Sequence, residues 1–266
     1  MAAVLSRPER RGGRARLRQG RGRAARPPGG VTLGPARRHA AALTLLALAL
    51  LGCGRSAGER TAVLMPHGEP TVLVMDFARP MALDPLPPGW HHRTFWTHAP
   101  MTMAFAVKDG VPALRLETHG TASMLFRHVD IDLADYPTLT WRWFVEQPID
   151  SPLDERTRAG DDHPARLFLT FHTATGDERS LEVIWGNRLL HRGDYKYIGK
   201  FAHYVADGGN ENAGRWQRET VDLSQVYRTV WPDAAPAHLY EVALFCDSDD
   251  TQTASISYFA EVALTH

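Results

Sequence analysis

Short runs in which apolar and polar residues alternate recur through most of the chain after residue 70. Every second residue is apolar in residues 113–118 and 138–145, the period of a half-buried strand. In the second run this period places Leu139, Trp141 and Trp143 on one face. Further runs with strand composition cover residues 71–77, 166–172, 180–185, 216–221, 240–247 and 254–264.

Helical signals are few. Residues 224–231 form the best candidate helix, with Ser224 as a candidate N-cap and Pro232 as a stop. The proline-rich residues 84–90 predict a loop. Many short strands separated by turn residues favour a mainly β, antiparallel sandwich with one or two short helices over alternating βαβ units.

The first 53 residues have a different pattern. An apolar run at residues 40–51, interrupted only by Thr44, follows Arg37-Arg38 and ends in Leu50-Leu51-Gly52-Cys53. A run of this length suits a signal-peptide core and is short for a membrane span. Its end resembles a lipobox, so Cys53 is the expected lipidation site. The alternatives are an ordinary signal peptide cut nearby, or a short buried helix.

This interpretation divides the chain into a leader (1–52), a lipidated cysteine with a flexible tether (53–70) and one β-sandwich domain (71–266). Gly54 follows the cysteine, which favours the outer membrane of a bacterial cell envelope, facing the periplasm. With Cys53 lipidated, Cys246 has no intramolecular partner, and its apolar surroundings predict a buried thiol.

Charge supports this division. Residues 1–38 hold eleven arginines and one acid, whereas the chain from Gly54 onward holds 19 Lys and Arg against 29 Asp and Glu. An acidic body argues against nucleic-acid binding, which needs positive charge along the phosphate backbone. The sequence does not indicate an oligomeric state.

Five motifs stand out along the chain: Trp141-Arg142-Trp143, Ala159-Gly160-Asp161-Asp162, Val183-Ile184-Trp185, Gly214-Arg215-Trp216-Gln217 and Asp247-Ser248-Asp249-Asp250-Thr251. Together they resemble a bacterial family, domain of unknown function 3047. The resemblance covers roughly residues 72–265 and implies a jelly-roll sandwich similar to galactose-binding-like domains and carbohydrate-binding modules. It implies no established activity. In the last motif Asp250 stands where the family usually has Asn.

Two acidic clusters lie beside predicted strands, and they are the main candidates for chemistry. Asp161, Asp162, Asp247 and Asp249 are candidate ligands for Ca²⁺, which prefers carboxylate oxygens. Alternatively Asp161, Asp162 or Asp247 act as acid and base in glycan cleavage. The third interpretation makes them turn and cap residues, held by backbone N–H groups and arginines. Arg142 and Arg166 are candidates to neutralise these carboxylates and to bind the ligand.

Aromatic residues suggest a carbohydrate ligand. All seven tryptophans follow residue 53; Trp141, Trp143 and Trp185 lie in strand runs and are expected in the core. Trp90 and Trp96 lie in a loop-like stretch and are candidate platforms on which a sugar could stack. The nearby His91, His92 and His98 lack a recognised zinc spacing, and the sequence has no G-x-S-x-G motif.

The function that these patterns favour is a non-catalytic module of the cell envelope that binds carbohydrate or another envelope polymer. The alternatives are a hydrolase or lyase acting on glycans through an aspartate pair, and a structural or assembly lipoprotein. The prediction of a binding module rests on fold analogy, which by itself does not establish function.

Overall fold

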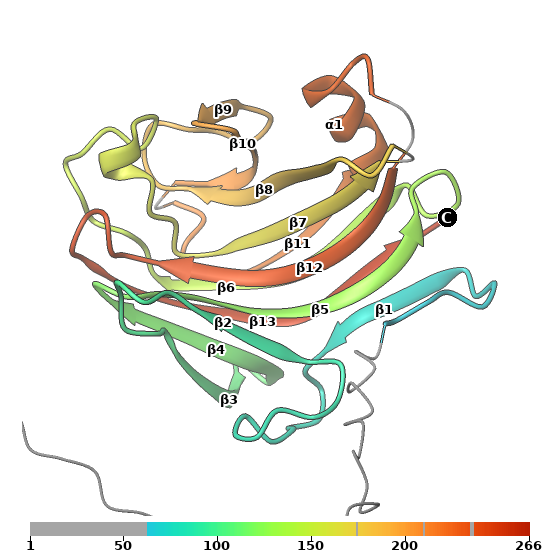
Figure 1. Ribbon diagram of the computed structural model, residues 1–266. Coiled ribbons are helices and arrows are strands. Elements are labelled where there is room, and N and C mark those ends of the chain that lie inside the picture. Colours follow the sequence, from blue (N-terminus) through green and yellow to red (C-terminus); the bar gives the residue numbers. More distant parts are fainter. Residues whose placement is uncertain (1–62, 174, 210, 235–236) are drawn as a thin grey trace, which may run out of the picture. The chain divides into compact units, whose positions relative to one another are not determined.

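Two β-sheets pack face to face in the computed structural model, which describes residues 63–266 except 174, 210 and 235–236 (Figure 1). The six-stranded sheet has the order β11-β6-β13-β4-β3, with β1 also paired to β13. Its strands are β1 (Thr71–Asp76), β3 (Thr102–Lys108), β4 (Val111–His119), β6 (Thr138–Gln147), β11 (Trp216–Asp222) and β13 (Ala254–Thr265).

The seven-stranded sheet has the order β2-β5-β12-β7-β8-β10-β9. Its strands are β2 (His91–Thr94), β5 (Ala122–Asp132), β7 (Arg166–Thr173), β8 (Glu178–Gly186), β9 (Tyr195–Ile198), β10 (Phe201–Gly208) and β12 (Ala237–Asp247). Outside the sheets, the described residues include a 3-10 turn at Arg158–Gly160 and the helix α1 (Leu223–Val230).

The strand order is that of a jelly roll. Strands β4 to β8 and β11 to β13 run β4-β13-β6-β11 in one sheet and β5-β12-β7-β8 in the other. Along the chain, every step between these eight strands crosses to the opposite sheet except the step from β7 to β8. Two sheets wound together in this way form the double Greek key of a jelly roll. The predicted mainly β sandwich is therefore confirmed, with one parallel pair, β8 and β10, among antiparallel neighbours.

The core lies between the sheets and is built on tryptophan. Trp141 and Trp143 of β6 and Trp185 of β8 are fully buried. The ring of Trp143 meets those of Trp141 and Trp185 at centroid distances of 5.2 and 5.6 Å, both edge to face. Large aromatic rings in this geometry contribute both buried area and favourable ring contacts. The prediction that these three tryptophans are core residues, and that Cys246 is buried, is confirmed.

Some local predictions differ from the structure. Helix α1 begins one residue earlier than expected, because Asp222 caps it by accepting the N–H of Gln225, and Ser224 lies inside the first turn. Strand β2 occupies part of the stretch that was expected to be loop. Strand β5 lacks clear alternation because residues 122–126 are buried on both faces of the sheet.

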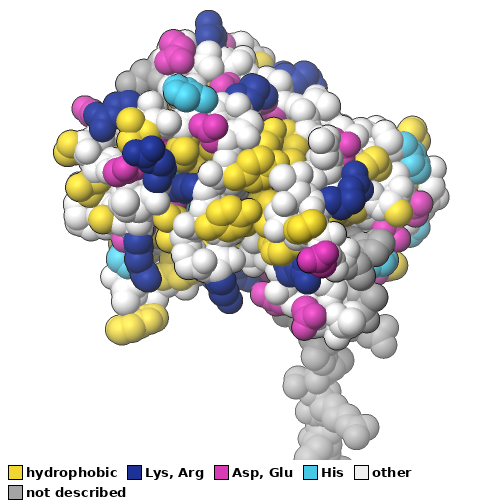
Figure 2. Space-filling view, turned by 90° about the horizontal axis from the view of Figure 1, so that it is seen from above, with side chains coloured by type: hydrophobic (Ala, Val, Ile, Leu, Met, Phe, Trp, Pro, Cys, Tyr) yellow, Lys and Arg dark blue, Asp and Glu magenta, His cyan; other side chains and the backbone are white. Residues whose placement is uncertain are grey.

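The Cys53 motif and the leader lie outside the described residues. Within the described part of the expected tether, Leu64 already pairs with strand β5, since its N–H donates to the carbonyl of His128. None of the helices among the described residues is long and apolar enough to cross a membrane. On the face seen in Figure 2, basic side chains are interspersed with acidic ones instead of forming one basic stripe.

Candidate functional site

The outer face of the seven-stranded sheet is apolar at one end. Residues of β5, β7 and β12 that point away from the core form a buried cluster of their own on this face. Phe95 and Phe201 extend the cluster, with centroid distances of 6.2 Å from Phe95 to Phe245 and 5.9 Å from Phe201 to Phe168. The buried members are Ala122, Met124, Phe126, Phe168, Ala243 and Phe245. A sheet with one face toward the core commonly leaves the other to solvent, so this outer aromatic cluster is unusual.

A cavity of about 780 Å³ opens over this cluster, and we call it the large pocket. Its walls come from the loop after β2, the turn between β9 and β10, and the loop after β12. The apolar floor meets a charged end formed by Asp161, Arg166, Glu182, Asp247, Asp249 and Asp250. A concave site with an apolar floor and a few convergent polar groups is the usual form of a ligand pocket.

Trp96 stands at the wall of the large pocket. Its side chain is 98% exposed, whereas its neighbour Phe95 turns inward onto Phe245. A tryptophan this exposed has no packing role in the fold, because its large apolar surface stays in water. It therefore remains free to contact a ligand.

Arg166 organises the charged end. The first residue of β7, it is fully buried and donates to Glu182 on the neighbouring β8 and to Asp247 on its other neighbour, β12. The same guanidinium lies 4.3 Å from the ring centroid of Phe245 and donates to the carbonyl of Asp161. The antiparallel pairing of β7 with β12 thus brings the two acidic segments of the sequence to one end of the sheet.

One guanidinium here serves two buried carboxyl groups. Burial raises the pKa of Asp247 well above its ordinary value, because burial together with the nearby Asp162 charge outweighs the opposing effect of Arg166. Burial acts in the same direction on Glu182, but Arg166 and His203 outweigh it and lower the pKa to about 2. The site thus combines a carboxyl that tends to keep its proton with one that is ionised.

A second buried network lies behind Asp161. Lys196 of β9 donates to Asp161, to the carbonyl of Glu155 and to Nε2 of His163. His163 Nδ1 lies 2.8 Å from the carbonyl oxygen of Trp185 and Nε2 accepts from Lys196, so the ring is the neutral tautomer with its proton on Nδ1. Burial and the charge of Lys196 lower the pKa of His163 to about 3. Burial acts to raise the pKa of Asp161, but the charge of Arg166 lowers it and Lys196 donates to the same carboxylate, so Asp161 stays ionised.

Asp162 has a different position from Asp161. It is fully buried, and its carboxylate accepts the N–H groups of Asp250 at 3.2 Å and Thr251 at 2.6 Å. Asp162 therefore holds the loop after β12 in place and is not among the residues that line the large pocket. Asp162, Asp247 and Asp249 offer oxygens within 4.8 Å of one another, so among the described residues they could hold a cation.

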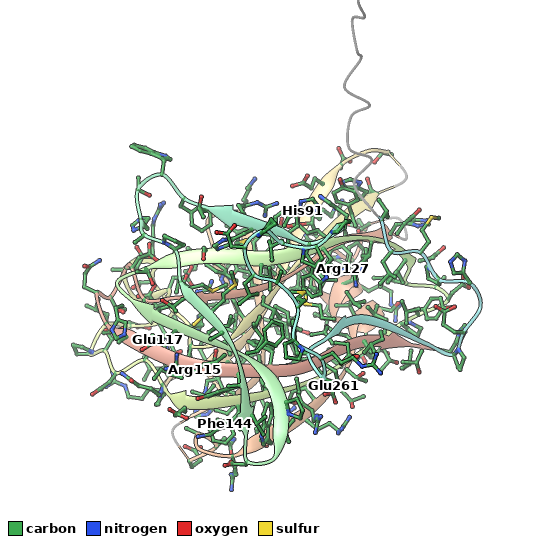
Figure 3. All side chains as sticks on the ribbon, turned by 90° about the horizontal axis from the view of Figure 1, so that it is seen from below. His91, Arg115, Glu117, Arg127, Phe144 and Glu261 are labelled. Carbon is green, nitrogen blue, oxygen red and sulfur yellow. The ribbon has the colours of Figure 1, made fainter. Side chains whose placement is uncertain are left out.

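Two of the predicted binding residues lie away from the large pocket. Trp90 packs against the core, where its ring lies 5.7 Å from that of Phe77 and the guanidinium of Arg127 covers it at 5.1 Å. Arg142 lies on the outer face of the six-stranded sheet, where its terminal Nη2 donates to Glu261 at 2.8 Å. Glu261 is labelled on that sheet in Figure 3, together with Phe144 and with Arg115 beside Glu117 on β4.

Sequence reasoning did not find Glu182, His163, Lys196 and His203. All four are buried. A charged residue that interrupts a strand, as Glu182 does between Leu181 and Val183, predicts an outward direction. The sequence does not show that this outward face is itself covered, because the segments that cover it are distant in sequence. The loop after β2 is one of them.

Comparison with known proteins identifies the family. The protein family of unknown function DUF3047 matches the chain over residues 88–263. The chain belongs to this family. The resemblance stated from the sequence motifs is thereby confirmed, and the match covers the strands that form the large pocket.

Solved structures similar to this DUF3047 protein have low sequence identity to it, and no curated protein matches it. The family 30 carbohydrate-binding module of the Clostridium thermocellum cellulosomal cellulase Cel9D-Cel44B has 10% identity and a TM-score of 0.42, covering 73% of this chain and 96% of that one. The xyloglucanase domain of NopAA, a Sinorhizobium fredii type three effector in complex with cellobiose, has 11% identity and a TM-score of 0.38 over 66% and 93%. Endoglucanase Cel12A from Rhodothermus marinus has 8% identity and a TM-score of 0.36 over 66% and 91%.

Proposed function

We propose that this DUF3047 domain binds carbohydrate in the large pocket, as a non-catalytic module. The observation that carries the proposal is Trp96, exposed at the wall of a pocket whose floor is aromatic and whose end is charged. A sugar ring presents C–H groups on its faces and hydroxyls around its edge. It therefore suits a site that combines flat apolar surface with hydrogen-bonding groups fixed in place.

The charged end supports a ligand rich in hydroxyl groups. Asp161, Glu182 and Asp247 offer acceptor oxygens at the pocket, and their positions are fixed by Arg166 and Lys196. Groups that are already oriented lose little conformational freedom on binding, which favours affinity. The pocket walls also carry cations, so the site does not select for charge of one sign.

The test is binding of the full-length protein to an array of neutral, acidic and N-acetylated glycans. We expect the wild type to bind at least one class, and Trp96→Ala to weaken that binding about tenfold or more, as loss of an aromatic anchor does. Tyr197→Ala is the matched control, since Tyr197 is 58% exposed and is not among the residues lining the large pocket. An array with no bound class, or equal binding by Trp96→Ala and the wild type, would refute the proposal.

Cleavage of the bound glycan is a second candidate function. It is favoured by the opposite pKa shifts of Asp247 and Glu182 in one pocket, since glycan cleavage uses one protonated and one ionised carboxyl group. New reducing ends released by the wild type, and lost in Asp247→Asn, would make the protein an enzyme. Binding without such release assigns it to the class of binding modules.

The proposed location of the protein is the bacterial cell envelope. Its support is the lipobox-like Leu50-Leu51-Gly52-Cys53 after a basic flank and a short apolar run. A lipid on Cys53 would hold the domain at the outer membrane, facing the periplasm. Glycans and other envelope polymers are then the ligands within reach.

A further inference from the structure

The outer face of the seven-stranded sheet carries a second hollow. This small pocket has a volume of about 440 Å³ and lies toward the opposite end of the same strands. Its lining residues are Val63, Val129, Asp130, His172, Thr173, His238 and Tyr240. His172 lies near the end of β7 and Tyr240 near the start of β12, whereas the large pocket is lined from the start of β7 and the end of β12. The two pockets therefore follow one another along the same pair of strands.

A continuous row of rings joins the two pockets. Phe126 belongs to the apolar cluster under the large pocket, and its ring contacts both His91 at 5.0 Å and His128 at 5.3 Å. His128 in turn lies 4.7 Å from Tyr240, and Tyr240 stacks on His172 at 4.0 Å with 18° between the planes. His91, labelled in Figure 3, comes from β2 at the edge of the sheet. The face therefore offers an aromatic floor along its length.

One polar bridge crosses this floor between the pockets. Arg93 of β2, which lines the large pocket, donates from both terminal nitrogens to Glu241 at 3.0 and 2.8 Å. Its guanidinium lies 4.4 Å above the Phe126 ring, and its side chain is 39% exposed while Glu241 is buried. Glu241 is adjacent to Tyr240 of the small pocket. The bridge thus places fixed hydrogen-bonding groups midway along the floor.

From this arrangement, and resting on the proposed carbohydrate-binding function, we infer that the ligand is an extended glycan chain that occupies both pockets and crosses the Arg93–Glu241 bridge. Phe245 and Tyr240 are five residues apart on β12, which corresponds to roughly 17 Å along a strand. A floor of this length accommodates several sugar units in a row, and a single sugar would leave the small pocket empty.

The site suits a glycan chain better than a peptide strand. Peptides that join a sheet pair with the free N–H and C=O groups of an edge strand. The floor lies instead on the faces of β5, β7 and β12, each of which is paired on both sides. A ligand there meets side chains only, so its recognition depends on stacking and on fixed polar groups.

The experiment compares chain lengths. Oligomers of glucose, xylose, mannose and N-acetylglucosamine, with two and with six units, are titrated into the full-length protein by calorimetry. We expect the six-unit oligomer of the preferred sugar to bind about tenfold or more tightly than the two-unit oligomer. Tyr240→Ala and His172→Ala should reduce this ratio to about threefold or less while leaving two-unit binding unchanged. Trp96→Ala should weaken binding of both lengths.

The outcomes separate this inference from the function on which it rests. If neither length of any sugar binds, the proposed carbohydrate binding fails. If two-unit and six-unit oligomers bind equally, or if the small-pocket variants keep the wild-type ratio, the domain binds glycan through the large pocket alone and the inference is refuted. Melting temperatures of Tyr240→Ala and His172→Ala, with Tyr197→Ala as control, test whether the variants are folded. Tyr240→Leu replaces a variant that does not fold.

Discussion

The carboxylate of Asp162 accepts the backbone N–H of Thr251 at 2.6 Å and also the hydroxyl of Thr251. These two residues are 89 positions apart, and the contact joins the segment before β7 to the loop after β12. Both predicted acidic clusters therefore meet at one end of the sheet. Asp162 orders the loop that carries Asp249 and Asp250, while Asp161, Asp247, Asp249 and Asp250 line the large pocket.

Replacing Asp162 should destabilise the domain. Asp162→Ala leaves the N–H groups of Asp250 and Thr251 without their acceptor in a partly buried loop, at a cost of about 2–3 kcal/mol in the free energy of unfolding. Urea unfolding of the variant and the wild type measures this cost. Asp150→Ala, at an exposed aspartate, is the control and should stay within about 0.5 kcal/mol of the wild type. A loss no larger than that of Asp150→Ala would show that the loop does not depend on Asp162.

The residues at the charged end should differ in their effect on stability. Arg166→Met leaves two buried carboxyl groups without a cation, which should cost about 3–5 kcal/mol in the free energy of unfolding at neutral pH. Asp247→Asn should change it by about 1 kcal/mol or less, because the amide oxygen of Asn can still accept from His163 and Arg166, and Arg166 keeps its pair with Glu182. Chemical unfolding of both variants measures the difference. Equal losses in the free energy of unfolding of the two variants would mean that Asp247 is ionised and forms an essential ion pair with Arg166.

His163 should make stability depend on pH. In the folded domain its pKa is about 3, whereas in the unfolded chain it binds a proton near its ordinary value of 6.5. Between these values the unfolded state holds the extra proton, so the free energy of unfolding falls as pH falls below about 6.5. One such proton corresponds to a slope of at most about 1.4 kcal/mol per pH unit.

The measurement is urea unfolding at a series of pH values between 6.5 and 4.5, above the range in which most carboxylates titrate. His163→Gln should show a shallower slope than the wild type, since the group that titrates on unfolding is gone. The exposed His119→Gln is the control and should keep the wild-type slope. An unchanged slope in His163→Gln would show that His163 is not the neutral buried group that its contacts indicate.

The proposed anchor predicts where lipid is attached. Cells that express the protein and are fed a palmitate analogue should label the wild type and leave Cys53→Ala unlabelled. Cys246→Ser is the control and should keep the label, because Cys246 is buried and burial raises the pKa of its thiol to about 11, which makes it unreactive. Equal label in the wild type and in Cys53→Ala would refute the anchor.

The sequence by itself determined most of the fold. A period of two in two runs and strand composition in six others located eight strands. Trp141, Trp143 and Trp185 lie in these runs and were expected in the core, because large aromatic side chains are usually buried. The sequence also predicted that the acidic segments flank strands, and it drew attention to Trp96. Strand β5 was not found because both of its faces are covered at one end, which removes the alternation.

The tertiary structure alone decided which of these residues meet. The pairing of β7 between β8 and β12 brings Arg166 to Glu182 and Asp247, whereas the pairing of β6 with β11 and β13 places Arg142 on the other sheet. The tertiary structure also buries Trp90 partly and leaves Trp96, six residues later, in solvent. The physical reason is that local periodicity fixes the face on which a side chain lies. What covers that face, and which charges share it, depends on strands and loops that are distant in sequence.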